Sequence, residues 1–325
     1  MKKFFCTVLC AAMLLSALTL TACGEAEALR IGLGVYTVTQ TGDAVGDKDG
    51  SAQATITVAA VLVDEKGKIV KCFLDCADHT VKYTAEGKAL ANESFQTKYE
   101  QGDAYGMKAW GGAAKEWYEQ ADAFSSLVVG KTVDEVKALV ASDHKGTADV
   151  IRAGCTIEVS AFALAIEKAV KDAAPSSAAA NDTLKLGVFT EQTTVDATED
   201  KPGQNQLETT LFAASVDKEG KITASRSDCV QIDFTFDANG ASLFDAATGI
   251  TSKREAGDAY GMKAWGGAAK EWYEQANTFD AACIGKRAGE LFGLLGADGY
   301  GIADLQRAGC TIDVSAFVEA ASKTG

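Results

Sequence analysis

The stretch GDAYGMKAWGGAAKEWYEQA, residues 102–121, returns unchanged at residues 257–276. Two shorter segments repeat at the same spacing of 155 positions: RAGCTI at residues 152–157 and 307–312, and SAF at residues 160–162 and 315–317. Repetition at one fixed spacing indicates a tandem duplication. Each copy is about 140 residues long, which is enough to bury a core of its own. We therefore expect one domain at residues 29–172 and a second at 183–325, joined by a small-residue linker at 173–182.

The N-terminus predicts export and lipidation. Lys2 and Lys3 precede an apolar run, and the run ends in LTACG at residues 20–24. A basic start, an apolar stretch and small residues before a cysteine are typical of a bacterial lipoprotein signal. We expect a signal peptide at residues 1–22, a lipidated Cys23 and a short tether at 23–28. The alternative is a retained signal-anchor helix. The prediction places the protein outside the cytoplasm, bound to the bacterial cell membrane through its lipid.

The charge balance excludes one large class of partner. The formal net charge is −14, and it becomes −16 once Lys2 and Lys3 leave with the signal peptide. Nucleic acid would be repelled by such a surface, so no nucleic-acid partner is expected. Anionic lipid headgroups are disfavoured for the same reason.

Each repeat is predicted to be an antiparallel sheet with helices on one side, which makes the fold class α+β. Val, Ile and Thr with partial period-two alternation indicate strands, and Lys66-Gly67 and Glu219-Gly220 are typical hairpin turns. Apolar residues at helical spacing and a capping-box pattern indicate helices, with Ser160 expected to cap the last one. In the first repeat the strands are predicted at 29–40, 54–64, 69–83 and 153–159, and the helices at 114–127, 132–140 and 161–173.

Histidines and cysteines offer little catalytic chemistry. The two histidines, His79 and His144, do not recur in the second repeat, where Ile232 takes the place of His79. We expect both to be solvated, and we expect no metal site. Beyond the signal and Cys23 there are six cysteines. They are interpreted as buried free thiols, with disulfides Cys76–Cys155 and Cys229–Cys310, or a redox-active thiol, as alternatives.

The repeated block around Trp110 has two interpretations. In the first, Met107, Trp110 and Trp117 fill the core while Lys115 and Glu119 form a solvated pair. In the second, the block builds an aromatic-walled pocket in which the glycines at 111 and 112 let a flat ring approach the backbone. The second repeat offers the same residues, among them Met262 and Trp265.

The RAGCTI segment resembles a signature of the FMN-binding domain family. In that family Asp, two residues, Ser or Thr, Gly, Ala and Thr precede an extended stretch and a helix, and a transferase links the FMN phosphate to the final Thr. Here DVIRAGCT (residues 149–156) and DLQRAGCT (residues 304–311) precede predicted helices. The Ser or Thr is replaced by Ala and the Ala by Cys, and the Asp lies one residue too far upstream.

The resemblance implies a flavin site in each repeat. It implies FMN, bound covalently or non-covalently, near Gly154, Cys155 and Thr156, and near Gly309, Cys310 and Thr311. The alternative for both threonines is a hydroxyl that caps the following helix. A second match, DAATGIT at residues 245–251, lacks a counterpart in the first repeat and is interpreted as chance.

Two functions from different classes follow. The first is a lipoprotein that carries electrons between a membrane donor and an extracellular acceptor by means of two flavins, with no other enzymatic activity. The second is a non-catalytic surface lipoprotein that keeps the fold without the flavin and binds a ligand or partner.

Overall fold

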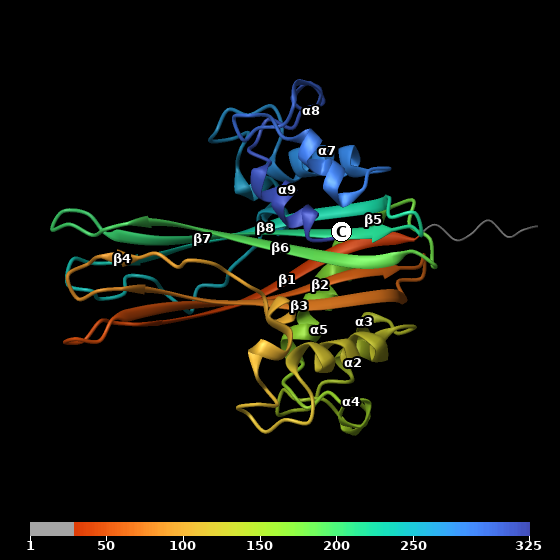
Figure 1. The fold of residues 1–325 in the computed structure, drawn as a ribbon, viewed down its shortest axis with the longest axis horizontal. Helices are drawn as coiled ribbons and strands as arrows, with labels where there is room; N and C mark the ends of the chain where they lie inside the picture. The colour runs from red at the N-terminus through yellow and green to blue at the C-terminus, as the bar shows by residue number, and fades with distance from the viewer. Residues whose placement is uncertain (1–28) are drawn as a thin grey trace, which may run out of the picture.

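The computed structural model describes residues 29–325, so the predicted signal peptide, Cys23 and the tether lie outside the described residues. Each repeat contributes one antiparallel sheet, and the two sheets face each other with helices on their outer sides (Figure 1). The α+β prediction, an antiparallel sheet per repeat with its helices on one side, is confirmed.

The first sheet has the strand order β4-β3-β2-β1-β5, and the second has the order β6-β7-β8. The strands of the first repeat are β1 (Arg30–Gly42), β2 (Gly50–Val63), β3 (Ile69–Tyr83) and β4 (Ala89–Leu90), and the segment between the repeats adds β5 (Ala174–Pro175) to their sheet. Those of the second repeat are β6 (Thr183–Val195), β7 (Gly203–Val216) and β8 (Ile222–Phe236). The three long strands of each repeat lie close to their predicted positions.

The helices are more numerous than predicted, and in the first repeat the first two predicted helices are shorter while the last has its predicted length. In the first repeat they are α1 (Lys98–Gln101), the 3-10 helix η1 (Gly102–Tyr105), α2 (Trp117–Val128), α3 (Val133–Lys137), α4 (Ala148–Ala153) and α5 (Ser160–Asp172). In the second they are α6 (Lys253–Ala256), η2 (Gly257–Tyr260), α7 (Trp272–Cys283), η3 (Ala288–Leu294), α8 (Ala303–Arg307) and α9 (Ser315–Ser322).

Two local predictions are wrong. Residues 153–159 form no strand: a short helix, α4, ends at Ala153, and only an isolated bridge joins Lys145 to Glu158. Ser160 is the first residue of α5 rather than its cap. Val159 occupies the cap position, and no side chain bonds to the helix start there.

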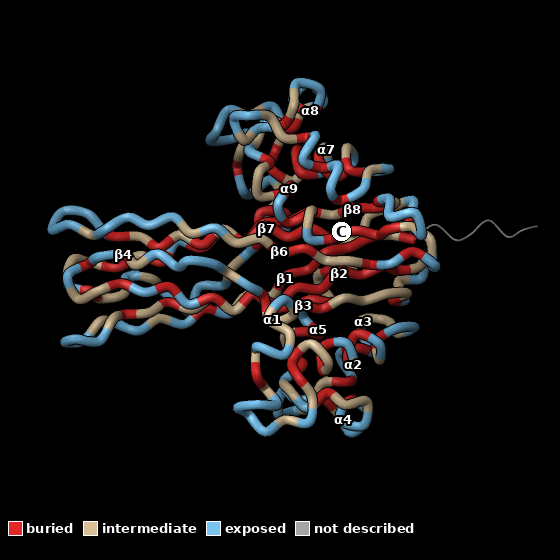
Figure 2. The backbone as a smooth tube through the Cα atoms, viewed as in Figure 1, coloured by how far each residue is buried: buried red, intermediate tan, exposed pale blue. Residues whose placement is uncertain are grey.

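The burial of the middle strand explains the sequence pattern of both sheets. In β2, buried and half-buried residues alternate from Gly50 to Thr55, and every residue from Ile56 to Val63 is buried. The strand β7 shows the same change. The helices cover only one half of each outer sheet face, so the other half forms an arm with one exposed side (Figure 2). Strand residues covered on both faces need not alternate.

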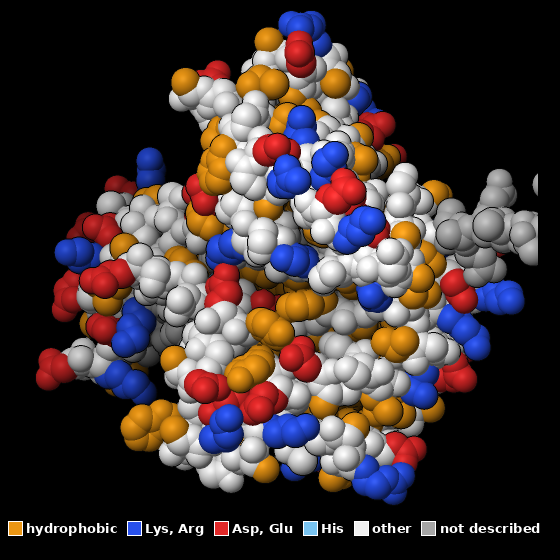
Figure 3. Space-filling model, turned by 45° about the vertical axis from the view of Figure 1, so that its right-hand side comes forward, with side chains coloured by type: hydrophobic (Ala, Val, Ile, Leu, Met, Phe, Trp, Pro, Cys, Tyr) orange, Lys and Arg blue, Asp and Glu red, His pale blue; other side chains and the backbone are white. Residues whose placement is uncertain are grey.

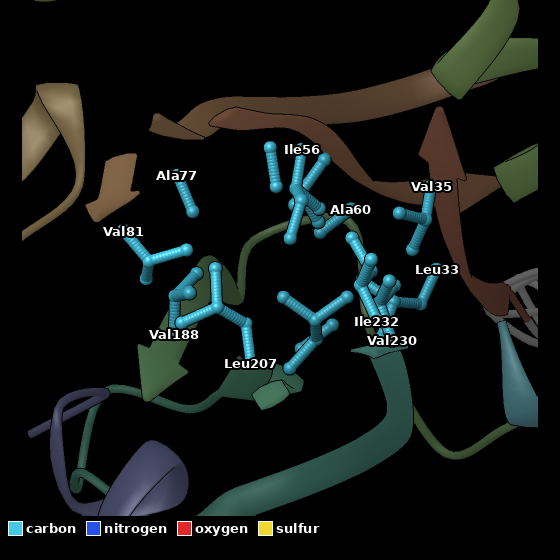
Figure 4. Packing of buried hydrophobic residues seen from close by; sticks show 14 of the residues in the cluster. Leu33, Val35, Ile56, Ala60, Ala77, Val81, Val188, Leu207, Val230 and Ile232 are labelled. Atoms are coloured by element: carbon cyan, nitrogen blue, oxygen red, sulfur yellow. The ribbon is translucent and has the colours of Figure 1, made fainter. Parts of the chain in front are cut away.

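Between the sheets lies an inner core to which both repeats contribute. Leu33, Ile56 and Val81 from the first sheet point toward Leu207 and Ile232 from the second (Figure 4). Two further cores lie between each sheet and its own helices. Each repeat therefore buries one sheet face by itself and the other face against its partner repeat.

Contacts between the repeats are reciprocal, which indicates a pseudo-two-fold relation. The ammonium of Lys168 pairs with Glu255 at 2.8 Å, and the equivalent Lys323 pairs with the equivalent Glu100 at 2.6 Å. The aromatic rings of Tyr83 and Phe236, which are also equivalent, stack with centroids 4.4 Å apart. The duplicated chain has the arrangement of a two-fold dimer whose subunits are covalently joined.

The segment between the repeats is packed against both of them. Ala174 and Pro175 form β5 and pair with the start of β1. The hydroxyl of Ser176 donates to the carbonyl of Leu29 at 2.7 Å. The buried carboxylate of Asp182 accepts from Thr223 of the second sheet at 2.6 Å.

Candidate functional site

The two sequence segments shared by the repeats meet in the structure. The side-chain oxygen of Gln120, in the long repeated block, accepts the backbone N–H of Thr156 at 2.8 Å and its hydroxyl at 3.0 Å. Gln275 and Thr311 repeat both bonds at the same distances. We call each meeting point a junction site. The first consists of Met107, Trp110, Lys115, Glu116, Gln120, Gly154, Cys155 and Thr156, and the second of the residues 155 positions later.

The Gln120 side chain contacts each part of the first junction site. Its side chain is almost completely buried, and its amide nitrogen donates to the carbonyl of Lys115 at 3.1 Å and contacts the sulfur of Met107 at 3.8 Å. One amide therefore joins the glycine-rich loop, the start of α2 and the threonine. The sequence prediction missed Gln120 and Gln275. Their place in the unchanged block was the available signal.

A buried glutamate fixes the loop that precedes α2. The carboxylate of Glu116 accepts the backbone N–H groups of Met107 at 2.7 Å and Lys108 at 3.1 Å. Glu116 is also the cap residue of α2, and its own N–H donates to Glu119 at 2.8 Å. Glu271 makes the same bonds in the second repeat. These bonds explain why α2 begins at Trp117, three residues later than predicted.

The two tryptophans of the block have opposite environments. Trp117 is 5% exposed and packs in the helix-side core, as the packing interpretation predicts. Trp110 is 88% exposed and its counterpart Trp265 90%, so neither fills a core. The indole of Trp110 lies over Gly106, where φ is +79° and a Cβ would overlap the ring. The absence of a side chain at Gly106 therefore lets the Trp110 indole lie against the backbone, and the rest of the indole is exposed to solvent.

Thr156 is exposed, whereas the cysteine before it is not. The thiol of Cys155 is wholly buried in the helix-side core, and burial raises its pKa to about 11. Cys310 has the same environment in the second repeat. Neither cysteine can therefore wall a ring at the surface. The hydroxyl of Thr156 bonds to Gln120 rather than to the start of α5, so the helix-capping interpretation does not hold.

A lysine lies over the glycine of the RAGCTI segment. The ammonium of Lys115 donates to the carbonyl of Ala153 at 3.4 Å, and a Cβ on Gly154 would overlap that side chain. The φ angle of Gly154 is +98°, a backbone conformation that glycine adopts without steric cost. Lys270 and Gly309 repeat the arrangement, with the ammonium 2.9 Å from the carbonyl oxygen of Ala308. Each site thus places a cation at the carbonyl of the residue three positions before an exposed threonine.

An open groove of about 490 Å³ runs beside the first junction site. It is lined by Lys115, Glu119, Asp122, Ala123, Ser126, Leu127 and Ala153. A separate cleft of about 410 Å³ lies between the repeats, along β1, α5 and α6, and shares no residue with the junction sites. On the face in Figure 3, acidic and basic side chains are interspersed rather than segregated.

The junction residues fit a phosphate-linked flavin in three respects. Thr156 offers an accessible hydroxyl for a phosphoester, Lys115 offers a cation to a phosphate, and Trp110 offers an exposed ring face. The same set exists in the second repeat. The carboxylates of Glu119 and Asp122 also line the groove and would repel a phosphate. A phosphate is therefore expected next to the ammonium of Lys115.

The prediction that His79 is solvated is wrong. His79 is 5% exposed, lies between the sheets, and has its Nε2 atom 3.1 Å from the hydroxyl of Thr190. Burial lowers its pKa to about 4, so the ring is neutral at pH 7. His144 is exposed, as predicted.

All six cysteines of residues 29–325 are free thiols. Five are buried and Cys72 is half-buried, in agreement with their interpretation as small apolar residues. In the same part of the chain, no cluster of three or more His, Cys, Asp or Glu residues could hold a metal ion. No helix among these residues is both long and apolar enough to span a bilayer.

Comparisons with known proteins give one partial similarity. Over 98 residues the chain is 37% identical to a protein named chlorophenol reductase from Desulfitobacterium hafniense. The match covers 25% of this chain and 29% of the length of that protein. No protein-family model matches the chain, and no solved structure matches it.

Proposed function

We propose that this chain is an extracytoplasmic lipoprotein, tethered through Cys23, that carries FMN on Thr156 and Thr311 and passes electrons between a membrane donor and an extracellular acceptor. One observation carries the proposal most. The side-chain oxygens of the repeated Gln120 and Gln275 accept bonds from exposed threonines, Thr156 and Thr311, at the position where the resemblance implies flavin attachment.

Each junction residue has a distinct part in this proposal. Gln120 holds the Thr156 hydroxyl in place, and its bond to the Thr156 N–H persists once the oxygen is esterified. Lys115 neutralises part of the phosphate charge. Trp110 covers one side of the ring system. The flavin supplies the electron chemistry when bound, and the protein supplies position and electrostatic environment.

The placement of the two sites favours a carrier with two separate centres. The helices α2 and α4 lie on one side of the paired sheets, and α7 and α8 lie on the opposite side (Figure 1). Two flavins would therefore face different surroundings rather than each other. The name of the partial relative, chlorophenol reductase, agrees with a role in redox chemistry.

Threonine substitutions test the covalent attachment. The soluble part, residues 24–325, is secreted together with a flavin transferase, and covalent flavin is read as in-gel fluorescence under blue light. Thr156→Ala and Thr311→Ala should each remove about half of the signal, and the double variant should remove all of it, because each site carries one acceptor oxygen. Thr251→Ala is the matched control, since it changes the threonine of the second match, DAATGIT at residues 245–251, and lies outside both junction sites. Full fluorescence in the double variant would contradict covalent attachment.

The second candidate, a binding protein without flavin, is favoured by the exposure of Trp110 and Trp265. Tryptophan is enriched among the residues that contribute most to binding energy at protein interfaces. Trp110→Ala should change the free energy of unfolding by less than about 0.5 kcal/mol, whereas Trp117→Ala should cost about 3–5 kcal/mol. Chemical denaturation measures both.

Flavin fluorescence separates the two candidates. In the flavin-loaded protein, loss of Trp110 and Trp265 should raise the flavin emission, because an indole stacked on the ring quenches it. Unchanged emission would place both tryptophans away from the flavin and leave them free for a partner.

A further inference from the structure

A lysine with a largely enclosed side chain precedes the glycine-rich loop in both repeats: Lys98 is half-buried and Lys253 is buried. Lys98 begins α1 and Lys253 begins α6, and their side chains are 13% and 9% exposed. The ammonium of Lys98 pairs with Asp78 at 3.0 Å, and that of Lys253 pairs with Glu208 at 2.9 Å. Burial opposes the charged form of each lysine, but the neighbouring thiol and carboxylate raise its pKa above the ordinary value.

The paired carboxylate comes from a different strand in each repeat. Asp78 lies on β3, directly opposite Thr55 of β2. In the second repeat the equivalent cross-strand pair is Gln231 on β8 and Glu208 on β7. The acidic residue thus occupies opposite members of the equivalent strand pair in the two repeats, while the lysine and its ion pair are present in both. Loss of either acid alone would leave a buried ammonium without a partner.

Each lysine also contacts the tyrosine that ends the following 3-10 helix. The ammonium of Lys98 lies 5.2 Å from the ring centre of Tyr105, and that of Lys253 lies 5.6 Å from the ring centre of Tyr260. Such a cation over a ring is attractive. The next residue after Tyr105 is Gly106, which supports the Trp110 indole, and Met107 follows. The lysine therefore contacts the residue directly before the glycine-rich loop that carries the exposed tryptophan.

We propose that Lys98 and Lys253 are positioning residues of the junction sites. Each ion pair holds its tyrosine and thereby sets the loop that carries Trp110 or Trp265, and the acid of the pair comes from β3 in the first repeat and from β7 in the second. The functional importance of this loop rests on the proposed function, but its positioning does not. The test is therefore carried out on flavin-free protein, and flavin loading is measured separately.

Hydrogen exchange of the full soluble chain, residues 24–325, tests the positioning. Asp78→Gln should make the amides of Met107 and Lys108 exchange roughly tenfold faster, because their bonds to Glu116 open more often. The unchanged second repeat serves as the internal control. Since the two blocks are identical, peptides must reach Gln101 or Asp122 to report on the first repeat, and Ala256 or Asn277 to report on the second.

A rescue variant decides between positioning and general loss of stability. Thr55→Glu with Asp78→Gln copies the second repeat's arrangement and should return loop exchange to the wild-type rate. The reverse pair, Glu208→Thr with Gln231→Asp, should leave the second loop unchanged. If Asp78→Gln unfolds the whole chain, the rescue variant still decides, because it must be folded with a slow loop. Normal loop exchange in Asp78→Gln, or a fast loop in the rescue variant, would overturn the proposal.

Discussion

The two repeats are identical at their junction sites but differ at one part of the contact between them, around Arg226 and Arg254. In the first repeat, Phe73, Tyr99 and Tyr118 form an aromatic cluster, with ring centroids 4.8 and 5.9 Å apart. In the second, Arg226 and Arg254 take the places of Phe73 and Tyr99.

The two arginines form a charged network that crosses between repeats. Arg226 donates to the carboxylate of Asp172 in the first repeat, and both arginines donate to the side-chain oxygen of Asn277. Arg254 also pairs with Asp280 at 3.1 Å, and both of these side chains are buried. Burial lowers the pKa of Arg254 and raises that of Asp280, so each depends on the other to stay charged.

The difference shows which constraints a duplication keeps. Junction residues bond within their own repeat, so the same set is required twice. Residues at the contact between the repeats can change in one copy alone, because a covalently joined pair need not stay symmetric. The Lys168–Glu255 and Lys323–Glu100 pairs have stayed alike, whereas Arg226 binds Asp172 in the second repeat's half of the contact only. Phe73 and Arg226 could diverge for this reason, whereas Gln120 and Gln275 have the same partners to satisfy.

Separation of the repeats should have the largest effect on this comparison. Residues 29–176 alone would expose the inner face of the first sheet, with Leu33, Ile56 and Val81 uncovered. We expect this fragment to form a two-fold dimer or to aggregate, because an apolar face of this size is not stable in water. Size-exclusion chromatography with light scattering measures the mass. A folded monomer would contradict the shared core.

Loss of Arg254 should have the next largest effect. Arg254→Ala leaves the buried Asp280 without its cation and should cost about 3–5 kcal/mol of unfolding free energy. A triple variant with the first repeat's residues, Arg226→Phe, Arg254→Tyr and Asp280→Ser, should recover most of that loss. Urea denaturation measures both variants. If the triple variant is no more stable than Arg254→Ala, the aromatic and charged clusters are not interchangeable.

A smaller effect is expected at His79, which the second repeat replaces with Ile232. The folded state lowers the pKa of His79 to about 4, so its stabilising contribution is complete above pH 6.5 and is lost as the pH falls through 4. Between pH 7 and 4.5 the wild type should lose about 2 kcal/mol more stability than His79→Ile. Denaturation curves at the two pH values measure the difference, and equal losses would show that His79 does not titrate in this range.

The sequence predicted what depends on local pattern. The long strands, the turn at Gly67 and the core role of Trp117 follow from alternation, glycine and helical spacing. It did not predict the inner core, because apolar faces do not reveal which surface covers them. His79 was misplaced for this reason, since the second sheet buries it.

The candidate site was predicted only in part. Thr156 and the repeated block were recognised, but as separate features, because the bond from Gln120 joins residues 36 positions apart. Trp110 and Trp117 could not be told apart by residue type. They lie on opposite sides of Glu116, whose carboxylate binds the N–H groups of the loop before α2 begins, and no local sequence pattern predicts those bonds.

The central claim is that each junction site carries one covalently bound flavin. Intact mass spectrometry of the secreted soluble part, produced with a flavin transferase, tests it most directly. We expect two additions, each equal to FMN minus one water, which peptide mapping assigns to Thr156 and Thr311. An unmodified mass, or an addition at Thr251, would contradict it.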